Sequence, residues 1–226
     1  MTKYFVIGLN KTGTTSIKYA LGVALGRDSL ATLKNIRGTD NIFLFTDFLI
    51  EKNKSIFKDR PWNTGCYKEL NERYNDSKFI LTIRDQEEWW TSVKNWLTLG
   101  AKWTKKFNQN EKIKKAYLNG KIKVYNNHFN CDSFNKDCYI NYYNSYNNAV
   151  IEYFKDKSNL YILNLDKDFN WSNIQKITNL DEETMIANII SSVKKKDFVP
   201  DNFNGKIKDL KLKDFKFVKR NKNILI

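Results

Sequence analysis

The residues best suited to chemistry lie in a short polar segment near the start of the chain. Gly8 is followed by four residues, then by Gly13 and two threonines, the spacing of a phosphate-binding loop. Such a loop usually has a lysine after its second glycine, whereas in this chain Thr14 has that place and the lysine lies inside the loop, at Lys11. The alternative is an ordinary polar turn, but an apolar run before it and a helical pattern after it favour an anion site. We expect phosphate to be bound by Asn10, Lys11, Thr12, Gly13, Thr14, Thr15 and Ser16.

A second group of candidates follows a later apolar run, at residues 78–83. That run ends at Arg84, and Ser92 lies eight residues further along the chain. Asp85 and Glu88 form a capping-box pattern, which predicts that a helix begins there and carries Ser92. Arginine offers a planar fork of donors to a phosphate, and serine can add its hydroxyl. The alternative for Arg84 is an ion pair with a nearby acid such as Asp85.

Alternating strands and helices must position these two groups. Apolar runs at residues 4–9, 55–58, 78–83 and 160–165 have the pattern of buried strands, and stretches of helical periodicity lie between them. No two strands are close enough for a hairpin, which predicts an α/β fold of three layers, of the phosphate-loop type, with a central, mainly parallel sheet flanked by helices. Ligands of such sheets bind at the carboxyl ends of the strands, so both groups should face one crevice. Without a repeat or a linker, we expect residues 1–226 to form a single domain.

Composition and charge add little to this. The 226 residues suffice for one fairly large domain with its own core, and the net charge of +14 is compatible with an anionic partner. Lysine supplies most of the positive charge and asparagine is abundant, a pairing better explained by the codon bias of an AT-rich genome than by a binding surface.

The three cysteines show no framework of disulfides or metal ligands. With a single histidine in the chain, Cys131, Cys138 and His128 are one ligand short of a structural zinc site unless a neighbouring aspartate joins them. We therefore expect Cys66, Cys131 and Cys138 to be reduced thiols. The first apolar run is too short for a signal peptide or a membrane span. These features predict a soluble protein in the cytoplasm or another intracellular compartment, with no bound metal and no transmembrane segment.

Both motifs resemble those of sulfotransferases that use 3′-phosphoadenosine 5′-phosphosulfate (PAPS). The segment FVIGLNKTGTTS is similar to the family's loop for the 5′-phosphosulfate, and KFILTIRDQEEWWTS is similar to its second signature. The resemblance implies that PAPS is the donor and that Arg84 and Ser92 bind its 3′-phosphate. It extends more weakly over FKDRPW and over YINYYNSYNNAV, where a subgroup commonly has a tyrosine and a histidine. This chain has Asn147 there and no histidine, and the subgroup's C-terminal Phe-Pro and Asn element is blurred into DFVPDNFN.

Sulfuryl transfer requires stabilisation of charge on the leaving group and a base for the acceptor's proton. Lys11 is the candidate for the first role. Asp59, at the end of the second predicted strand, is the first candidate for the base, and Asp47 and His128 are alternatives. Each of these acids could also be a helix cap or a surface residue, and His128 lies in a polar, asparagine-rich stretch that predicts a loop.

Two other functions fit the same loop. A kinase using a nucleotide triphosphate is disfavoured because Thr14 replaces the usual lysine. In addition, no apolar strand ends in a metal-binding aspartate at the position of the second motif, where Asp85, directly after Arg84, is the nearest acid. A basic protein that binds polyanions without catalysis is the other alternative. The acceptor has no sequence motif; we expect it to be anionic or a glycan, and we expect no specific nucleic acid partner.

Overall fold

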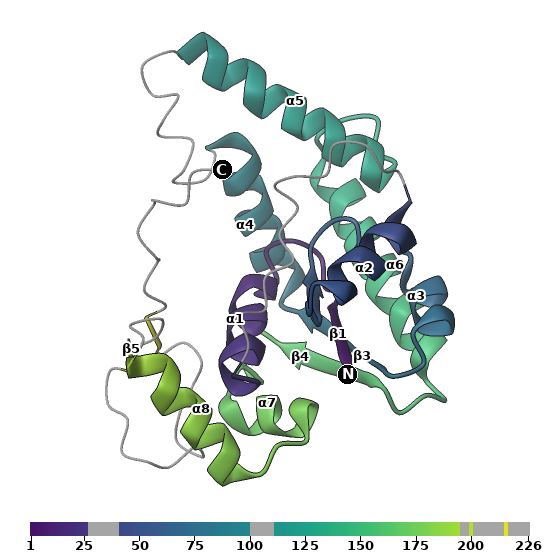
Figure 1. Cartoon of the computed structure of the whole chain (residues 1–226). Coiled ribbons are helices and arrows are strands. Elements are labelled where there is room, and N and C mark those ends of the chain that lie inside the picture. Colours follow the sequence, from purple (N-terminus) through teal and green to yellow (C-terminus); the bar gives the residue numbers. More distant parts are fainter. Residues whose placement is uncertain (27–40, 100–110, 195–198, 201–214, 217–226) are drawn as a thin grey trace.

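The computed structural model describes residues 1–26, 41–99, 111–194, 199–200 and 215–216. The main sheet in these residues consists of β1 (Lys3–Val6), β2 (Ile56–Lys58), β3 (Ser77–Ile83) and β4 (Leu160–Asn164). The strand order is β2-β1-β3-β4 and each neighbouring pair is parallel, so the four carboxyl ends meet at one edge (Figure 1). The predicted α/β fold with a parallel central sheet is confirmed.

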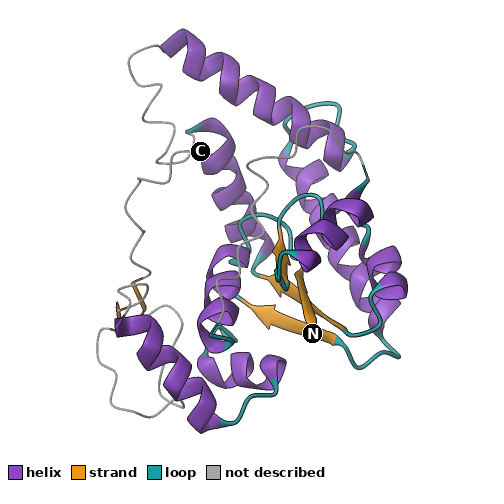
Figure 2. Ribbon diagram, viewed as in Figure 1, coloured by secondary structure: helices purple, strands orange, loops and turns teal. Residues whose placement is uncertain are grey.

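Helices cover both faces of this sheet, which gives the three predicted layers (Figure 2). Successive residues of a strand point to opposite faces, so Phe5 packs against Phe57 and Phe79 on one face while Tyr4 and Val6 lie on the other. The phenylalanine face is covered by α3 (Tyr67–Arg73), α4 (Gln86–Thr98) and α6 (Lys136–Phe154), and the opposite face by α1 (Thr14–Ala24), α7 (Trp171–Thr178) and α8 (Glu182–Lys194).

Two further helices extend the layer on the phenylalanine face. α2 (Ile42–Glu51) packs Phe45 against Trp62, with ring centres 5.8 Å apart, and α5 (Glu111–Phe129) adds Tyr125 and Phe129 to the core. In Figure 1, α5 lies at the top of the molecule, at the opposite end from α7 and α8. A short antiparallel pair, β5 (Val199–Pro200) and β6 (Phe215–Lys216), is separate from the main sheet. Among the helices described, none combines the length and the apolar character needed to cross a membrane.

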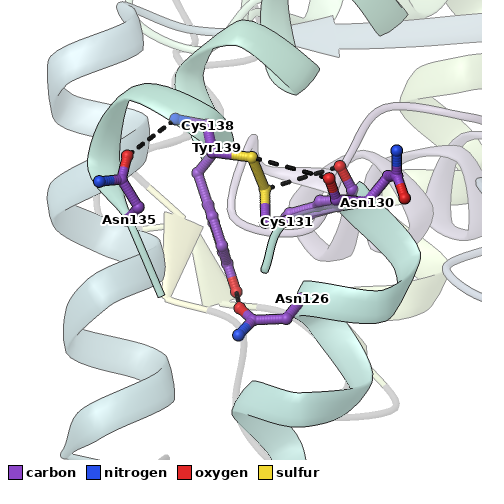
Figure 3. The surroundings of a disulfide bond; sticks show 7 residues. Asn126, Asn130, Cys131, Asn135, Cys138 and Tyr139 are labelled. Carbon is purple, nitrogen blue, oxygen red and sulfur yellow. Dashed lines mark hydrogen bonds between the residues drawn. A yellow bond between two sulfur atoms is a disulfide. The ribbon is translucent and has the colours of Figure 1, made fainter. Parts of the chain in front are cut away.

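A disulfide between Cys131 and Cys138 joins the end of α5 to the start of α6 (Figure 3). Close by, the Tyr139 hydroxyl donates to Asn126 Oδ1 at 2.7 Å, which links the same two helices. The prediction of reduced thiols is wrong for this pair, because the turn that reverses the chain after α5 brings the two sulfur atoms together. The zinc alternative fails for the same reason, since both sulfur atoms are bonded to each other. Cys66 is a free thiol, and burial raises its pKa to about 11.

The structure also corrects two local predictions. His128 lies in the last turn of α5 and not in a loop, because Tyr125 and Phe129 bury one face of this otherwise polar stretch. Trp96 shares helical spacing with Trp89 and Val93, which predicts a core position, but it is only partly buried at the rim of that core. The lysine-rich stretches at residues 194–196 and 208–222, and the segment DFVPDNFN, lie almost entirely outside the described residues.

Candidate functional site

The loop between β1 and α1 has the backbone of an anion site. Lys11 and Gly13 have φ values of 77° and 93°, so the chain turns twice through the left-handed region within three residues. Gly13 precedes the first turn of α1, and within the described part of the chain no side-chain hydrogen bond caps this helix. The first amides of a helix have no partner within it, and the helix dipole makes this end electropositive. The loop therefore presents unpaired amides and partial positive charge at the carboxyl edge of the sheet.

Gly13 also has to be a glycine for steric reasons. A Cβ atom there would lie 2.5 Å from the Phe169 ring and 2.8 Å from a methyl group of Leu165. Gly8 is equally restricted, because a Cβ would meet the backbone and side chain of Thr82 on β3. The spacing of the two glycines thus reflects close packing of the loop against β3 and against the segment after β4.

Two predicted ligands of the loop have side chains that hold the loop itself. The Thr12 hydroxyl is buried; it donates to the Leu9 carbonyl at 2.6 Å and lies 2.6 Å from the Thr82 hydroxyl. The Asn10 side chain accepts a hydrogen bond from the Asn63 amide at 2.9 Å. Both side chains point into the protein, so they shape the loop, whereas the other hydroxyls, of Thr14, Thr15 and Ser16, lie at the start of α1.

The end of β2 meets the start of α1. Asp59 is also in the left-handed region, at φ 61°, and its Oδ1 accepts a hydrogen bond from the Thr14 hydroxyl at 3.2 Å. Lys58 Nζ forms an ion pair with Asp59 and donates to the Thr15 hydroxyl at 3.2 Å. Of the two threonines of the loop motif, Thr14 therefore contacts the candidate base directly, and Thr15 is linked to it through Lys58.

Lys58 is a site residue that the sequence analysis missed. Its side chain is only 9% exposed, although it carries a charge. The available signal was its position: a lysine ends an otherwise apolar strand directly before the candidate base. The loop motif singles out Lys11 alone, and nothing in the sequence distinguishes a second lysine among so many.

Arg84 lies at the carboxyl end of β3, as predicted. Its acidic partner is Glu88, one helical turn on, and not Asp85, which caps α4 by accepting from the amides of Glu87 and Glu88 at 2.9 and 3.0 Å. The Tyr143 hydroxyl exchanges hydrogen bonds with both peptide groups of Arg84, at 3.0 and 2.9 Å. Arg84 Nε is buried and has no hydrogen-bond partner among the described residues. This leaves one donor of a firmly held arginine available.

Ser92 and the loop are related through α4. Ser92 lies two turns into this helix and is partly buried, while Trp89 on the same helix donates its Nε1–H to the Asn10 carbonyl at 3.0 Å. One element thus bonds the phosphate loop and carries the predicted partner of Arg84.

Two lysines, one from α5 and one from the phosphate loop, lie near Trp96 of α4. Lys121 Nζ, from α5, is 3.3 Å from the centre of the Trp96 ring and donates to the Trp96 carbonyl at 3.1 Å. Lys11 Nζ is 6.0 Å from the same ring. Burial and the positive charge of Lys11 lower the pKa of Lys121 to about 8, and burial and Arg84 lower the pKa of Lys11. Mutual repulsion of this kind is relieved when an anion binds.

The two alternative bases have different surroundings. Asp47 accepts hydrogen bonds from Tyr74 at 2.8 Å and Arg73 at 2.5 Å; burial raises its pKa, but these bonds lower it overall. The Tyr74 carbonyl accepts from Ser77, the first residue of β3, which places Asp47 by the amino edge of the sheet and away from the loop. His128 is close enough to Arg60, the neighbour of Asp59, for the Arg60 charge to act on it, and burial together with this charge lowers the pKa of His128 to about 4.

The donor set fits a nucleotide with two separate anionic groups. One group can bind the loop amides, Lys11 and the start of α1, and the other can bind the unpaired donor of Arg84 with Ser92. Each of these groups donates hydrogen bonds or carries positive charge, as recognition of phosphate and sulfate requires.

Comparison with known proteins identifies the family of the chain. A search of curated protein sequences finds no match to the chain. The profile of a family described as the sulfotransferase domain matches residues 3–181, which include the phosphate loop, Asp59, Arg84 and the whole parallel sheet. Because the match covers well over half of the 226 residues, the chain belongs to the sulfotransferase family.

Proposed function

We propose that this sulfotransferase uses PAPS as donor and transfers the sulfuryl group to a hydroxyl or amine acceptor. The observation that carries the proposal is the pairing of an uncapped helix N-terminus beside Lys11 with a separate, buried arginine donor at Arg84. PAPS has a 5′-phosphosulfate and a 3′-phosphate. The first can bind at the helix N-terminus beside Lys11, and the second can bind at Arg84. When bound, the donor supplies a sulfuryl group attached to a phosphate that can leave.

The residues of the loop meet the charge that develops on the leaving phosphate. Lys11 is held in place by its left-handed backbone, and its ammonium is partly desolvated, which strengthens its interaction with an anion. Lys58, already bonded to Thr15, adds a second positive charge at the start of α1. We infer that the chain itself provides the positive charge for the reaction, without a metal.

Asp59 is our candidate for the base that accepts the acceptor's proton. It lies at the carboxyl edge, in a left-handed conformation that ordinary side chains rarely adopt, and its carboxylate contacts Thr14 of the loop. We disfavour Asp47 for this role because it lies by the opposite edge of the sheet. At neutral pH His128 is uncharged, and no described hydrogen bond joins it to the loop. Asp59 is preferred because it contacts Thr14 directly.

Calorimetric titration tests the donor. We expect 3′-phosphoadenosine 5′-phosphate to bind without metal and more tightly than ATP with magnesium. A preference for ATP with magnesium would favour the kinase, and binding of polyanions alone would favour a protein without catalysis.

Asp59→Asn should keep the affinity for the bisphosphate within a few fold, because the amide keeps the shape, and should lower turnover by a factor of about 10² to 10⁴. Unchanged turnover would exclude Asp59 as the base.

A further inference from the structure

We propose that the acceptor carries an anionic group of its own, a carboxylate or a sulfate, which Arg60 and Lys121 bind on the wall that α5 forms beside the phosphate loop. The inference rests on the proposed function and names the class of acceptor: a compound that already carries an acidic group beside the hydroxyl or amine to be sulfated.

Arg60 provides the first observation. It follows Asp59 directly, and its guanidinium carbon lies 4.9 Å from the centre of the Tyr125 ring on α5. Its Nη2 is buried and has no hydrogen-bond partner among the described residues. A buried cationic donor without an acceptor is unfavourable, so a ligand that supplies an oxygen atom is expected there.

Lys121 provides the second observation, independent of the first. It precedes Tyr125 by one helical turn, so its side chain and the Arg60 contact lie on the same face of α5. Lys121 is held against Trp96 and forms no ion pair with a described acid. Nearby, Asp59 is already paired with Lys58. The α5 wall is therefore a second region with excess positive charge and no described counter-ion.

The position of Arg60 and Lys121 on this wall favours binding of the acceptor, and not of the donor, by these two cations. The two anionic groups of the donor are already provided for by the loop and by Arg84. Arg60 is adjacent in sequence to Asp59, the candidate base. An anion bound to Arg60 would therefore lie near the acceptor's hydroxyl or amine, whose proton Asp59 takes.

The test uses the full chain saturated with 3′-phosphoadenosine 5′-phosphate, so that the donor site is filled. Sodium sulfate is then titrated at constant ionic strength, with sodium chloride as the balancing salt, while NMR records the ring signals of His128, the only histidine of the chain. His128 is a suitable reporter because it senses the charge of Arg60. We expect a saturable change in its signals that chloride alone does not produce.

Variants then assign the sulfate site. Arg60→Met and Lys121→Met should each weaken sulfate binding at least tenfold, whereas Lys123→Met, which removes an exposed charge from the same helix, should leave it unchanged. Arg60→Lys, which keeps a charge, should retain part of the affinity and shows whether a loss in Arg60→Met reflects folding.

Three results would overturn the inference: no saturable change with sulfate, an unchanged sulfate affinity in Arg60→Met, or an equal loss of bisphosphate and sulfate affinity in both methionine variants. The last would assign these cations to the donor. Failure of the proposed function is recognised separately, because the unaltered protein would then not bind the bisphosphate in the first step.

Discussion

The cations of the site differ in whether an acidic side chain already neutralises their charge. Lys58 is paired with Asp59 and Arg84 with Glu88, whereas the described charge that acts on Lys11 is the positive one of Arg84. Paired cations keep their charge at little cost, but each must exchange its acidic partner for the ligand. A cation without an acidic partner is destabilised by burial and by neighbouring positive charges, and binding of an anionic ligand removes this destabilisation. If these residues bind the proposed donor, loop preorganisation and loss of repulsion should both contribute to the affinity.

The role of Arg84 predicts selectivity between two nucleotides. Arg84→Met should weaken binding of 3′-phosphoadenosine 5′-phosphate about ten- to hundredfold, because a charge-assisted contact contributes roughly 1.5–3 kcal/mol. Adenosine 5′-phosphosulfate lacks the 3′-phosphate and should lose much less. Glu88→Gln is the matched control: it removes the competing acid, so affinity should stay the same or rise by a few fold. Calorimetry checks all three, and equal losses for both nucleotides in Arg84→Met would contradict the assignment.

His128 predicts a pH effect with a defined sign. Its pKa of about 4 is below the ordinary value of 6.5, so between these pH values the unfolded chain binds a proton that the folded chain does not. The contribution of His128 to stability is thus present above pH 6.5 and is lost as the pH falls towards 4. NMR titration of this single histidine measures its pKa directly, and Arg60→Met should raise it. A pKa near 6.5 in the folded protein would show that burial and Arg60 do not act on the ring.

At the scale of elements, α5 depends on its attachment to α6. α5 is largely polar, and its contacts with the rest of the molecule include Tyr125, Phe129 and the disulfide that follows. The same half of the helix carries Lys121 and His128. Whatever holds this half of α5 therefore also positions the wall proposed for the acceptor.

The disulfide predicts a thiol count and a stability. In denatured, unreduced protein only Cys66 should react with a thiol reagent, and after reduction all three cysteines should react. The double variant Cys131→Ala, Cys138→Ala should lower the free energy of unfolding by about 2–3 kcal/mol, through loss of the cross-link in the unfolded chain. Urea denaturation measures this, with Cys66→Ala as the control for removing a thiol. Three reactive thiols in the unreduced protein would show that the bond is not formed.

Elements that combine periodicity with a motif could be predicted from the sequence, and elements set by tertiary contacts could not. The strand of residues 78–83 and the cap at Asp85 follow from local pattern, and so does the helix after Gly13. The approach of Cys131 to Cys138 depends on how the chain reverses after α5, which no local pattern records. The same holds for the contact of Lys121 with Trp96, two residues far apart in sequence.

At the scale of the whole molecule, the site belongs to no single layer. The loop joins β1 to α1 on one face of the sheet, whereas α4 and α5 belong to the other face (Figure 1). Lys11 of the loop and Lys121 of α5 both approach the ring of Trp96 on α4. The two core clusters, one on each face, therefore both support the site. A ligand bound there bridges the layers, so its binding energy should oppose unfolding of the whole sheet and not of one helix.

This arrangement predicts a stabilisation by the bisphosphate that needs no metal. At a concentration of 3′-phosphoadenosine 5′-phosphate one hundred times its Kd, the folded state should gain about 2.7 kcal/mol, which corresponds to a rise in Tm of about 5–11 °C for a chain of this size. EDTA should leave the rise unchanged, because Lys11, the loop amides and the N-terminus of α1 supply the positive charge. Lys11→Ala should reduce the rise at the same ligand concentration, while Lys123→Ala, at an exposed position of α5, should not. Differential scanning calorimetry measures these shifts; a rise that appears only with magnesium, or one that is unaffected in Lys11→Ala, would show that the positive charge for the donor comes from elsewhere.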